Sequence, residues 1–172
     1  AVEAGGRDGD AGRCGFRRRR DSRFVTLRLP SLEACPFCAY LEGAGECAFV
    51  ARDERVATFV NLRQYERGAL LVVPVRHVTT LLEVDPDTLA AVHGEARRVG
   101  RALLAAFGAS GLNVFQNNGI DAGQTIPHFH VHVVPRYPGG DPMRLFREAN
   151  HAPVSFAERV QIAAAVQAHL EP

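Results

Sequence analysis

The segment PHFHVHVVPR, residues 127–136, places three histidines at alternate positions inside an apolar run. Side chains of a β-strand point alternately to its two faces, so His128, His130 and His132 share one face and the intervening apolar residues share the other. Successive histidines would lie about 7 Å apart, from two residues at about 3.3 Å each. The run therefore predicts a strand with a core on one side and a row of imidazoles on the other. This spacing favours three separate tasks over one shared metal ion.

A row of three histidines would lower the stability of the fold if it served only to build a core. Each imidazole needs hydrogen-bond partners, and any two that become charged repel each other. A single histidine on a strand is more often structural, but a core alone would use valine at all three positions. We therefore interpret the row as functional.

The chain of 172 residues is long enough to bury one core, and we expect residues 31–172 to form a single domain that ends in a helix. Residues 1–30 contain an arginine block at 17–20 among glycines and acids, which is typical of a disordered basic tail. The formal net charge of +1 gives no reason to expect a nucleic-acid partner. No apolar stretch is long enough for a secretion signal or a membrane span, so we expect a cytoplasmic protein that does not contact membranes.

Short apolar segments bounded by turn residues predict strands at 47–51, 56–62, 69–73, 112–117 and 129–134. Asp85 and Pro86 predict the start of a helix whose apolar residues recur every three or four positions as far as Gly108. A capping box at Ser155 predicts a last helix with one apolar side made of Phe156, Val160, Ala163 and Leu170. The expected fold class is α+β, with an antiparallel five-stranded meander sheet and helices packed on one face.

The loop NNGIDAGQT, residues 117–125, leads directly into the histidine run. Gly119 and Gly123 permit tight curvature that leaves backbone N–H groups free to face an anion, and Asn117, Gln124 and Thr125 add neutral donors. Such a loop is suited to hold a phosphate against the histidines. The alternative is that Asn-Gly is simply a favourable turn dipeptide.

The four cysteines are Cys14, Cys35, Cys38 and Cys47. A reducing compartment argues against disulfides, and the C-x-x-C spacing of Cys35 and Cys38 is typical of either a metal knuckle or a redox pair. Cys14 and Cys47 have no evident partner.

The stretch GQTIPHFHVHVV resembles the signature of the histidine-triad (HIT) superfamily of nucleotide-binding hydrolases and transferases. The similarity extends back through FVNLRQYERGALLVVPVRH to CPFC, over residues 35–137. The chain is most similar to bacterial zinc-containing HIT proteins and to the dinucleoside polyphosphate hydrolase branch. The resemblance implies a HIT-like fold and a homodimer.

The resemblance also implies roles for individual residues. His130 would be the nucleophile that attacks the α-phosphorus of a nucleotide, and His132 would contact the phosphate and assist charge or proton balance. Asn61 would bind ribose hydroxyls. The positions that would bind phosphate oxygens or the leaving group are Asn117, Gln124 and Thr125. Imidazole suits this chemistry because, with an ordinary pKa near 6.5, most of it is neutral and nucleophilic at pH 7.

Some relatives hold a zinc ion with a C-x-x-C pair, a histidine after the third strand and the first histidine of the triad. The matching positions here are Cys35, Cys38, His77 and His128. Such a Cys₂His₂ set closes the coordination of tetrahedral zinc, which is the property of a structural site. It would pin the N-terminal segment to the catalytic strand.

The expected function is cleavage of the α-phosphate linkage of a dinucleoside polyphosphate, a nucleoside phosphoramidate or an adenylate, with an adenine nucleotide as substrate. The intermediate would be a nucleotidyl-histidine. One alternative is a nucleotide-sensing or interaction protein with the same fold. Another is a metalloprotein that uses His-x-His as ligands, although no acidic ligand follows the pair within 133–140. Many relatives have Gly-His where this chain has Gly68 and Ala69, which leaves the substrate open.

Overall fold

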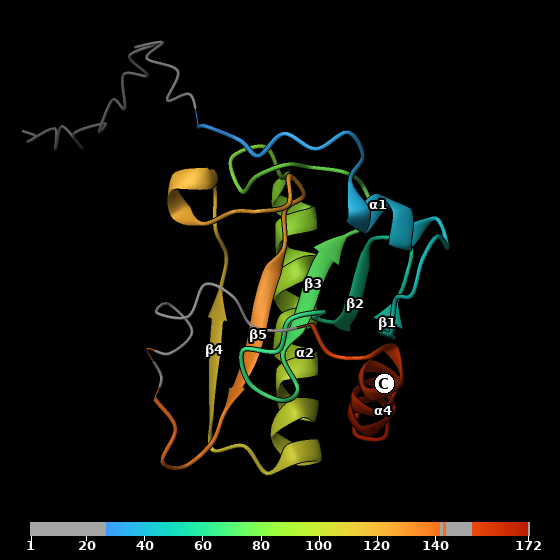
Figure 1. The fold of residues 1–172 in the computed structure, drawn as a ribbon, viewed down its shortest axis with the longest axis vertical. Helices are drawn as coiled ribbons and strands as arrows, with labels where there is room; N and C mark the ends of the chain where they lie inside the picture. The colour runs from blue at the N-terminus through green and yellow to red at the C-terminus, as the bar shows by residue number, and fades with distance from the viewer. Residues whose placement is uncertain (1–26, 142, 144–152, 172) are drawn as a thin grey trace, which may run out of the picture.

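A computed structural model describes residues 27–141, 143 and 153–171 of the chain (Figure 1). Residues 1–26 of the predicted basic tail, and Cys14 with them, lie outside the described residues. Within the described part, none of the helices combines the length and apolar character needed to cross a membrane.

One antiparallel sheet organises the domain, and every strand predicted from the sequence overlaps a strand of the structure. The strands are β1 (Phe49–Arg52), β2 (Val56–Val60), β3 (Leu70–Pro74), β4 (Gly111–Phe115) and β5 (Val131–Arg136). The expected α+β class is therefore confirmed.

The strand order is β1-β2-β3-β5-β4, so only the first three strands follow the predicted meander. Both β3 and β4 pair antiparallel with β5, and they consequently run in the same direction. Strands that run in the same direction need a crossover connection, which the long helix α2 (Pro86–Phe107) provides. The crossover leaves a gap one strand wide, and β5 fills it.

Helix α2 begins and ends where the sequence predicts. The Asp85 side chain accepts a hydrogen bond from the Thr88 N–H at 2.9 Å, and Gly108 ends the helix in the left-handed conformation with φ of 62°. The helix packs across β5, β3 and β2 on one face of the sheet, where Val131 and Val133 point toward it. Figure 1 shows α2 lying along this face.

Helix α4 (Phe156–Gln167) starts at the predicted cap, where Ser155 accepts from the Glu158 N–H at 3.2 Å. Its predicted apolar side is wrong in part, because Phe156 and Val160 are exposed. The buried residues of the helix are Arg159, Ile162, Ala163 and Val166. Burial of Arg159 is possible because its guanidinium donates to the Glu46 carbonyl at 2.7 Å, a partner far away in sequence.

The short helix α1 (Pro36–Leu41) covers the opposite face of the sheet. Its Phe37 and Leu41 pack in a second core with Ala57, Phe59, Leu71 and Val73. The prediction of helices on one face thus holds for α2 and α4 but not for α1. The histidines of the row lie on the same face of the sheet as α1, and Phe37 of this helix contacts the rings of His128 and His130.

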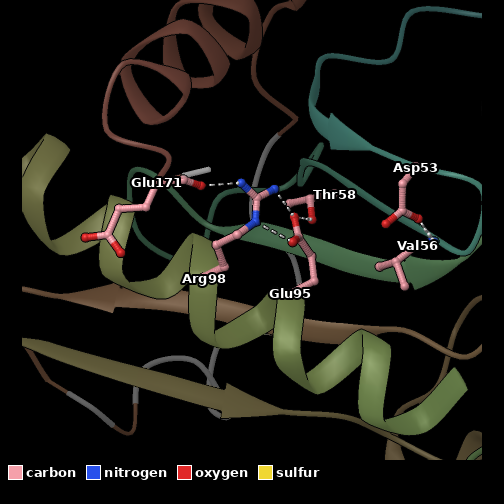
Figure 2. Close-up of polar contacts among 6 residues, drawn as sticks. All are labelled: Asp53, Val56, Thr58, Glu95, Arg98 and Glu171. Carbon is pink, nitrogen blue, oxygen red and sulfur yellow. Dashed lines mark hydrogen bonds and ion pairs between the residues drawn. The ribbon is translucent and has the colours of Figure 1, made fainter. Parts of the chain in front are cut away.

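A polar network fastens the chain end to α2 (Figure 2). The hydroxyl of Thr58, a fully buried residue of β2, donates to Glu95 Oε1 at 3.0 Å. Arg98 donates to both oxygens of Glu95 through Nε and Nη2, at 2.7 and 2.9 Å, and through Nη1 to the Glu171 carbonyl at 3.2 Å. These bonds satisfy the buried hydroxyl and hold α2 against β2, on the face of the sheet opposite the histidines.

Candidate active site

The three histidines of the row are buried side by side. His128 is fully buried, and His130 and His132 are each 6% exposed. The ring centroids of His130 and His132 lie 4.9 Å apart, with an interplanar angle of 64°. Strand β5 starts only at Val131, so His128 and His130 belong to the segment that enters the strand.

The contacts of His130 leave one ring nitrogen available. Its Nδ1 lies 2.6 Å from the His128 carbonyl oxygen, so Nδ1 carries the proton and Nε2 carries the lone pair. The ring of Phe37 meets it edge-on at 5.3 Å. Burial lowers the pKa of His130, while the bond to the carbonyl opposes this shift. The imidazole is therefore neutral near pH 7, the state in which it is a nucleophile.

His132 is held by aromatic rings. Phe115 stacks on it with centroids 4.5 Å apart and an interplanar angle of 3°, and Tyr65 lies 5.6 Å away at 58°. Its Nδ1 is buried and has no hydrogen-bond partner. Burial, and to a smaller extent His130, lower the pKa of His132 to about 3. A buried nitrogen without a partner is rare, which marks this atom as available to a ligand.

The four predicted metal ligands come together. One ligand atom from each of Cys35, Cys38, His77 and His128 lies within 4.8 Å of all the others. The Cys38 Sγ to His77 Nδ1 distance is 3.2 Å, and His128 Nδ1 lies 3.5 Å from Cys35 Sγ and 3.7 Å from Cys38 Sγ. Two ligands of tetrahedral zinc, with bonds of about 2.3 Å to sulfur and 2.0 Å to nitrogen, lie about 3.6 Å apart. The residues therefore fit a zinc ion.

The contacts around this cluster support that fit. His128 donates Nε2–H to the Pro74 carbonyl at 2.9 Å, which turns its Nδ1 lone pair toward the sulfurs. Burial, together with Cys35, raises the pKa of Cys38 to about 11, so a cation is needed to hold Cys38 as a thiolate. Cys47 lies outside the cluster.

The loop at 117–125 curves through Gly119 and Gly123, whose φ angles are 82° and 84°. Gln124 is buried inside it, where its Oε1 accepts from the Gly119 N–H at 2.7 Å and its Nε2 donates to the carbonyls of Thr79 and Ile126 at 2.8 and 3.1 Å. Its side chain thus braces the loop, and a contact with phosphate stays a prediction.

The other predicted binding residues differ in exposure, and of the three only Asn61 is buried. Thr125 is exposed, and Asn117 is partly buried with its Nδ2 3.5 Å from the Gly123 carbonyl. Asn61, directly after β2, accepts from the Arg63 N–H at 3.3 Å through Oδ1.

Three aromatic residues at this site, Phe37, Tyr65 and Phe115, could not be assigned to it from the sequence. Phe115 occupies the histidine face because β4 pairs with β5 in a register that sets it opposite His132. The alternation within LNVFQN gives the face of Phe115 relative to its own strand, but only the strand order brings it to the histidines.

A row of buried imidazoles entered through a glycine-rich loop, on a five-stranded antiparallel sheet crossed by one long helix, defines the class of histidine-triad proteins. Residues 42–139 match the family model described as the HIT domain, and the chain belongs to this family.

Two of the relatives are named for an enzymatic activity. The asymmetrical bis(5'-nucleosyl)-tetraphosphatase of Schizosaccharomyces pombe is 40% identical over 85 residues, 49% of this chain and 47% of that enzyme. An adenylylsulfatase of Arabidopsis thaliana is 31% identical over 102 residues, 59% of this chain and 52% of that enzyme. The chain thus spans about half the length of each. "Protein hit" of Bacillus subtilis is 35% identical over 109 residues, 63% of this chain and 75% of that protein.

Solved structures agree with the fold. A Hit-like protein of Bartonella henselae superposes with a TM-score of 0.74 at 24% identity, over 82% of this chain and 99% of that one. A zinc-bound histidine triad family protein of Mycobacterium smegmatis has a TM-score of 0.68 at 30% identity, over 79% and 92%.

Proposed function

We propose that this protein is a nucleotide hydrolase or nucleotidyl transferase that works through a covalent nucleotidyl-histidine on His130. The substrate class is a dinucleoside polyphosphate, a nucleoside phosphoramidate or an adenylate, with an adenine base. The observation that carries the proposal is the 2.6 Å bond from His130 Nδ1 to the His128 carbonyl, because it leaves Nε2 as the lone-pair nitrogen of a buried, neutral imidazole.

The reaction follows from this arrangement. Nε2 of His130 attacks the α-phosphorus, a P–N bond forms, and the bond to the leaving group breaks with the electron pair on the leaving group. Water or another acceptor then attacks the same phosphorus, which releases the nucleotide and returns the electron pair to Nε2. Covalent capture replaces one difficult displacement with two easier ones.

The remaining site residues stabilise the charge on the phosphate oxygens. His132 has a buried nitrogen without a partner, which suits a contact to one of these oxygens. Backbone N–H groups of the 117–125 loop, with Asn117 and Thr125, would supply neutral donors, and Gln124, whose Nε2 donates to two backbone carbonyls, would hold that loop in shape. Phosphoryl transfer depends mainly on such donors and on positioning. Asn61 would bind the ribose.

We also propose that zinc binds to Cys35, Cys38, His77 and His128 as a structural ion. When bound, it would hold the segment before α1 to the entry of β5 and satisfy two thiolates. The expected homodimer and the cytoplasmic location stay predictions.

A substrate screen with two variants tests the proposal. Diadenosine tetraphosphate, adenylylsulfate and adenosine phosphoramidate would each be incubated with metal-replete protein, and products would be identified by mass. His130→Ala should lower turnover at least about 10³-fold while AMP binding persists, whereas His93→Ala, at an exposed position of α2, should match the wild type. Full turnover by His130→Ala would overturn the mechanism, and AMP binding without turnover by the wild type would favour a sensing protein.

A further inference from the structure

His132 is oriented differently from the two histidines before it. His128 and His130 each direct one ring nitrogen to a backbone carbonyl, at 2.9 and 2.6 Å. Such bonds fix both the tautomer and the rotation of a ring. The Nδ1 of His132 has no such partner. Its orientation must therefore come from packing.

The packing against Phe115 has the geometry needed to hold a ring plane. Phe115 is directly opposite His132 in the β4–β5 ladder, and side chains of such cross-strand pairs contact each other on one face of a sheet. Their rings are nearly parallel, at 3°, with centroids 4.5 Å apart. A tilt of the imidazole out of this plane would drive it into the Phe115 ring.

Two further rings limit the remaining freedom of His132. Tyr65, in the connection between β2 and β3, lies 5.6 Å from His132 and 6.4 Å from Phe115. His130, two residues earlier in the segment that leads into β5, lies 4.9 Å away at 64°. None of these contacts uses the buried Nδ1, so the imidazole is held while that nitrogen stays available.

We propose that Phe115 is a positioning residue: by stacking on His132 it sets the plane in which this imidazole meets the phosphate bound at His130. The proposal rests on the proposed function for its effect on the reaction. Its structural part, the stack itself, is independent of any activity.

The proposal predicts a spectroscopic signature in the wild-type protein. Protons on the His132 ring should be shifted upfield by the ring current of Phe115, relative to those of the exposed His93 and His169. Histidine-selective labelling and NMR of the full chain measure this directly. Ring protons of His132 at the shifts of the exposed histidines would overturn the proposal without any variant and without any assay of turnover.

The kinetic test compares a residue that removes the ring with one that keeps it. Phe115→Leu should lose the upfield shift and lower kcat about tenfold, the scale expected for one aromatic pair, with KM changed less than about threefold. Phe115→Tyr, which keeps the ring, should retain both the upfield shift and the wild-type kcat. Val114→Thr, on the same strand but the other face and 45% exposed, is the matched control and should change neither.

Two outcomes contradict the proposal. In one, Phe115→Leu folds, loses the upfield shift and keeps the wild-type kcat. In the other, Phe115→Tyr folds and keeps the upfield shift but loses the wild-type kcat. If the wild type itself turns over none of the substrates, the proposed function fails, whereas the NMR measurement still decides whether Phe115 holds His132.

Discussion

His128 and His132 lie four residues apart on one face of the sheet, but different kinds of contact hold their imidazoles. Both ring nitrogens of His128 face partners, the Pro74 carbonyl on one side and the two cysteine sulfurs on the other. His132 is held by a parallel stack on Phe115, and its Nδ1 has no partner. Directional bonds consume the donors and acceptors that they fix, whereas stacking leaves them available. We call the end of the row at His128, beside the proposed zinc ligands, the metal end, and the end at His132, stacked on Phe115, the aromatic end. The metal end is therefore suited to a structural role and the aromatic end to chemistry, with His130 between them.

The largest expected effect is at the metal end. Cys38→Ser removes one of four ligands, and we expect it to lose zinc and to lower the free energy of unfolding by about 4 kcal/mol or more, the scale of losing a structural metal. Elemental analysis and urea unfolding measure the two effects. Cys47→Ser, outside the cluster, is the control and should keep both metal and stability. A Cys38→Ser protein with full zinc content and wild-type stability would show that this end is not a metal site.

A smaller loss is expected in the loop that leads into the row. Gln124→Met keeps the length of the side chain but removes its bonds to Gly119, Thr79 and Ile126. Because these backbone groups lose their partner where water has little access, the free energy of unfolding should fall by about 2 to 3 kcal/mol.

The control for this variant is Gln167→Met. Gln167 also donates to two backbone carbonyls, those of Phe49 and Val50, but from an exposed position. Water can replace those bonds, so the loss should stay below about 1 kcal/mol. Equal losses in both variants would mean that Gln124 does not brace the loop.

The smallest effect tests the aromatic end through its pH dependence. The pKa of His132 is lowered to about 3 by burial, against an ordinary value near 6.5 in the unfolded chain. Between these values the unfolded chain binds a proton that the folded protein does not, so stability falls as the pH decreases from about 6.5 toward 3. From pH 7 to pH 5, the wild type should lose about 2 kcal/mol more than His132→Gln.

Urea unfolding of both proteins at the two pH values measures this difference. Acid also releases metal ligands, but that loss is common to both proteins and cancels. An equal loss of stability in wild type and His132→Gln would mean that folding does not lower the pKa of His132. The contrast between the two ends would then disappear.

Much of this arrangement could be predicted from local sequence. The alternation of His128, His130 and His132 with apolar residues fixes which side chains share a face, and Asp85 and Gly108 mark the ends of α2 through their own backbone chemistry. The metal ligands could be proposed from the resemblance to the HIT family, and the structure brings all four together.

Other features depend on contacts between distant segments. The place of β5 between β3 and β4 follows from the crossover by α2, which no single strand records. The same is true of the buried Arg159, which needs the Glu46 carbonyl, and of Phe115, which reaches His132 only through the strand order. The local sequence suggests Gln124 as a phosphate donor, but it does not show the bond from this side chain to the Thr79 carbonyl, because Thr79 lies 45 residues away.

His130 is the proposed nucleophile, and rapid-quench mass spectrometry tests this role most directly. Wild-type protein would be mixed with whichever substrate it turns over, quenched in base within the first turnovers, digested and analysed. We expect one nucleotidyl group on the peptide that contains residues 123–136, attached to His130, labile in acid, and absent from His130→Ala. Turnover without any adduct, or an adduct on another residue, would contradict the account.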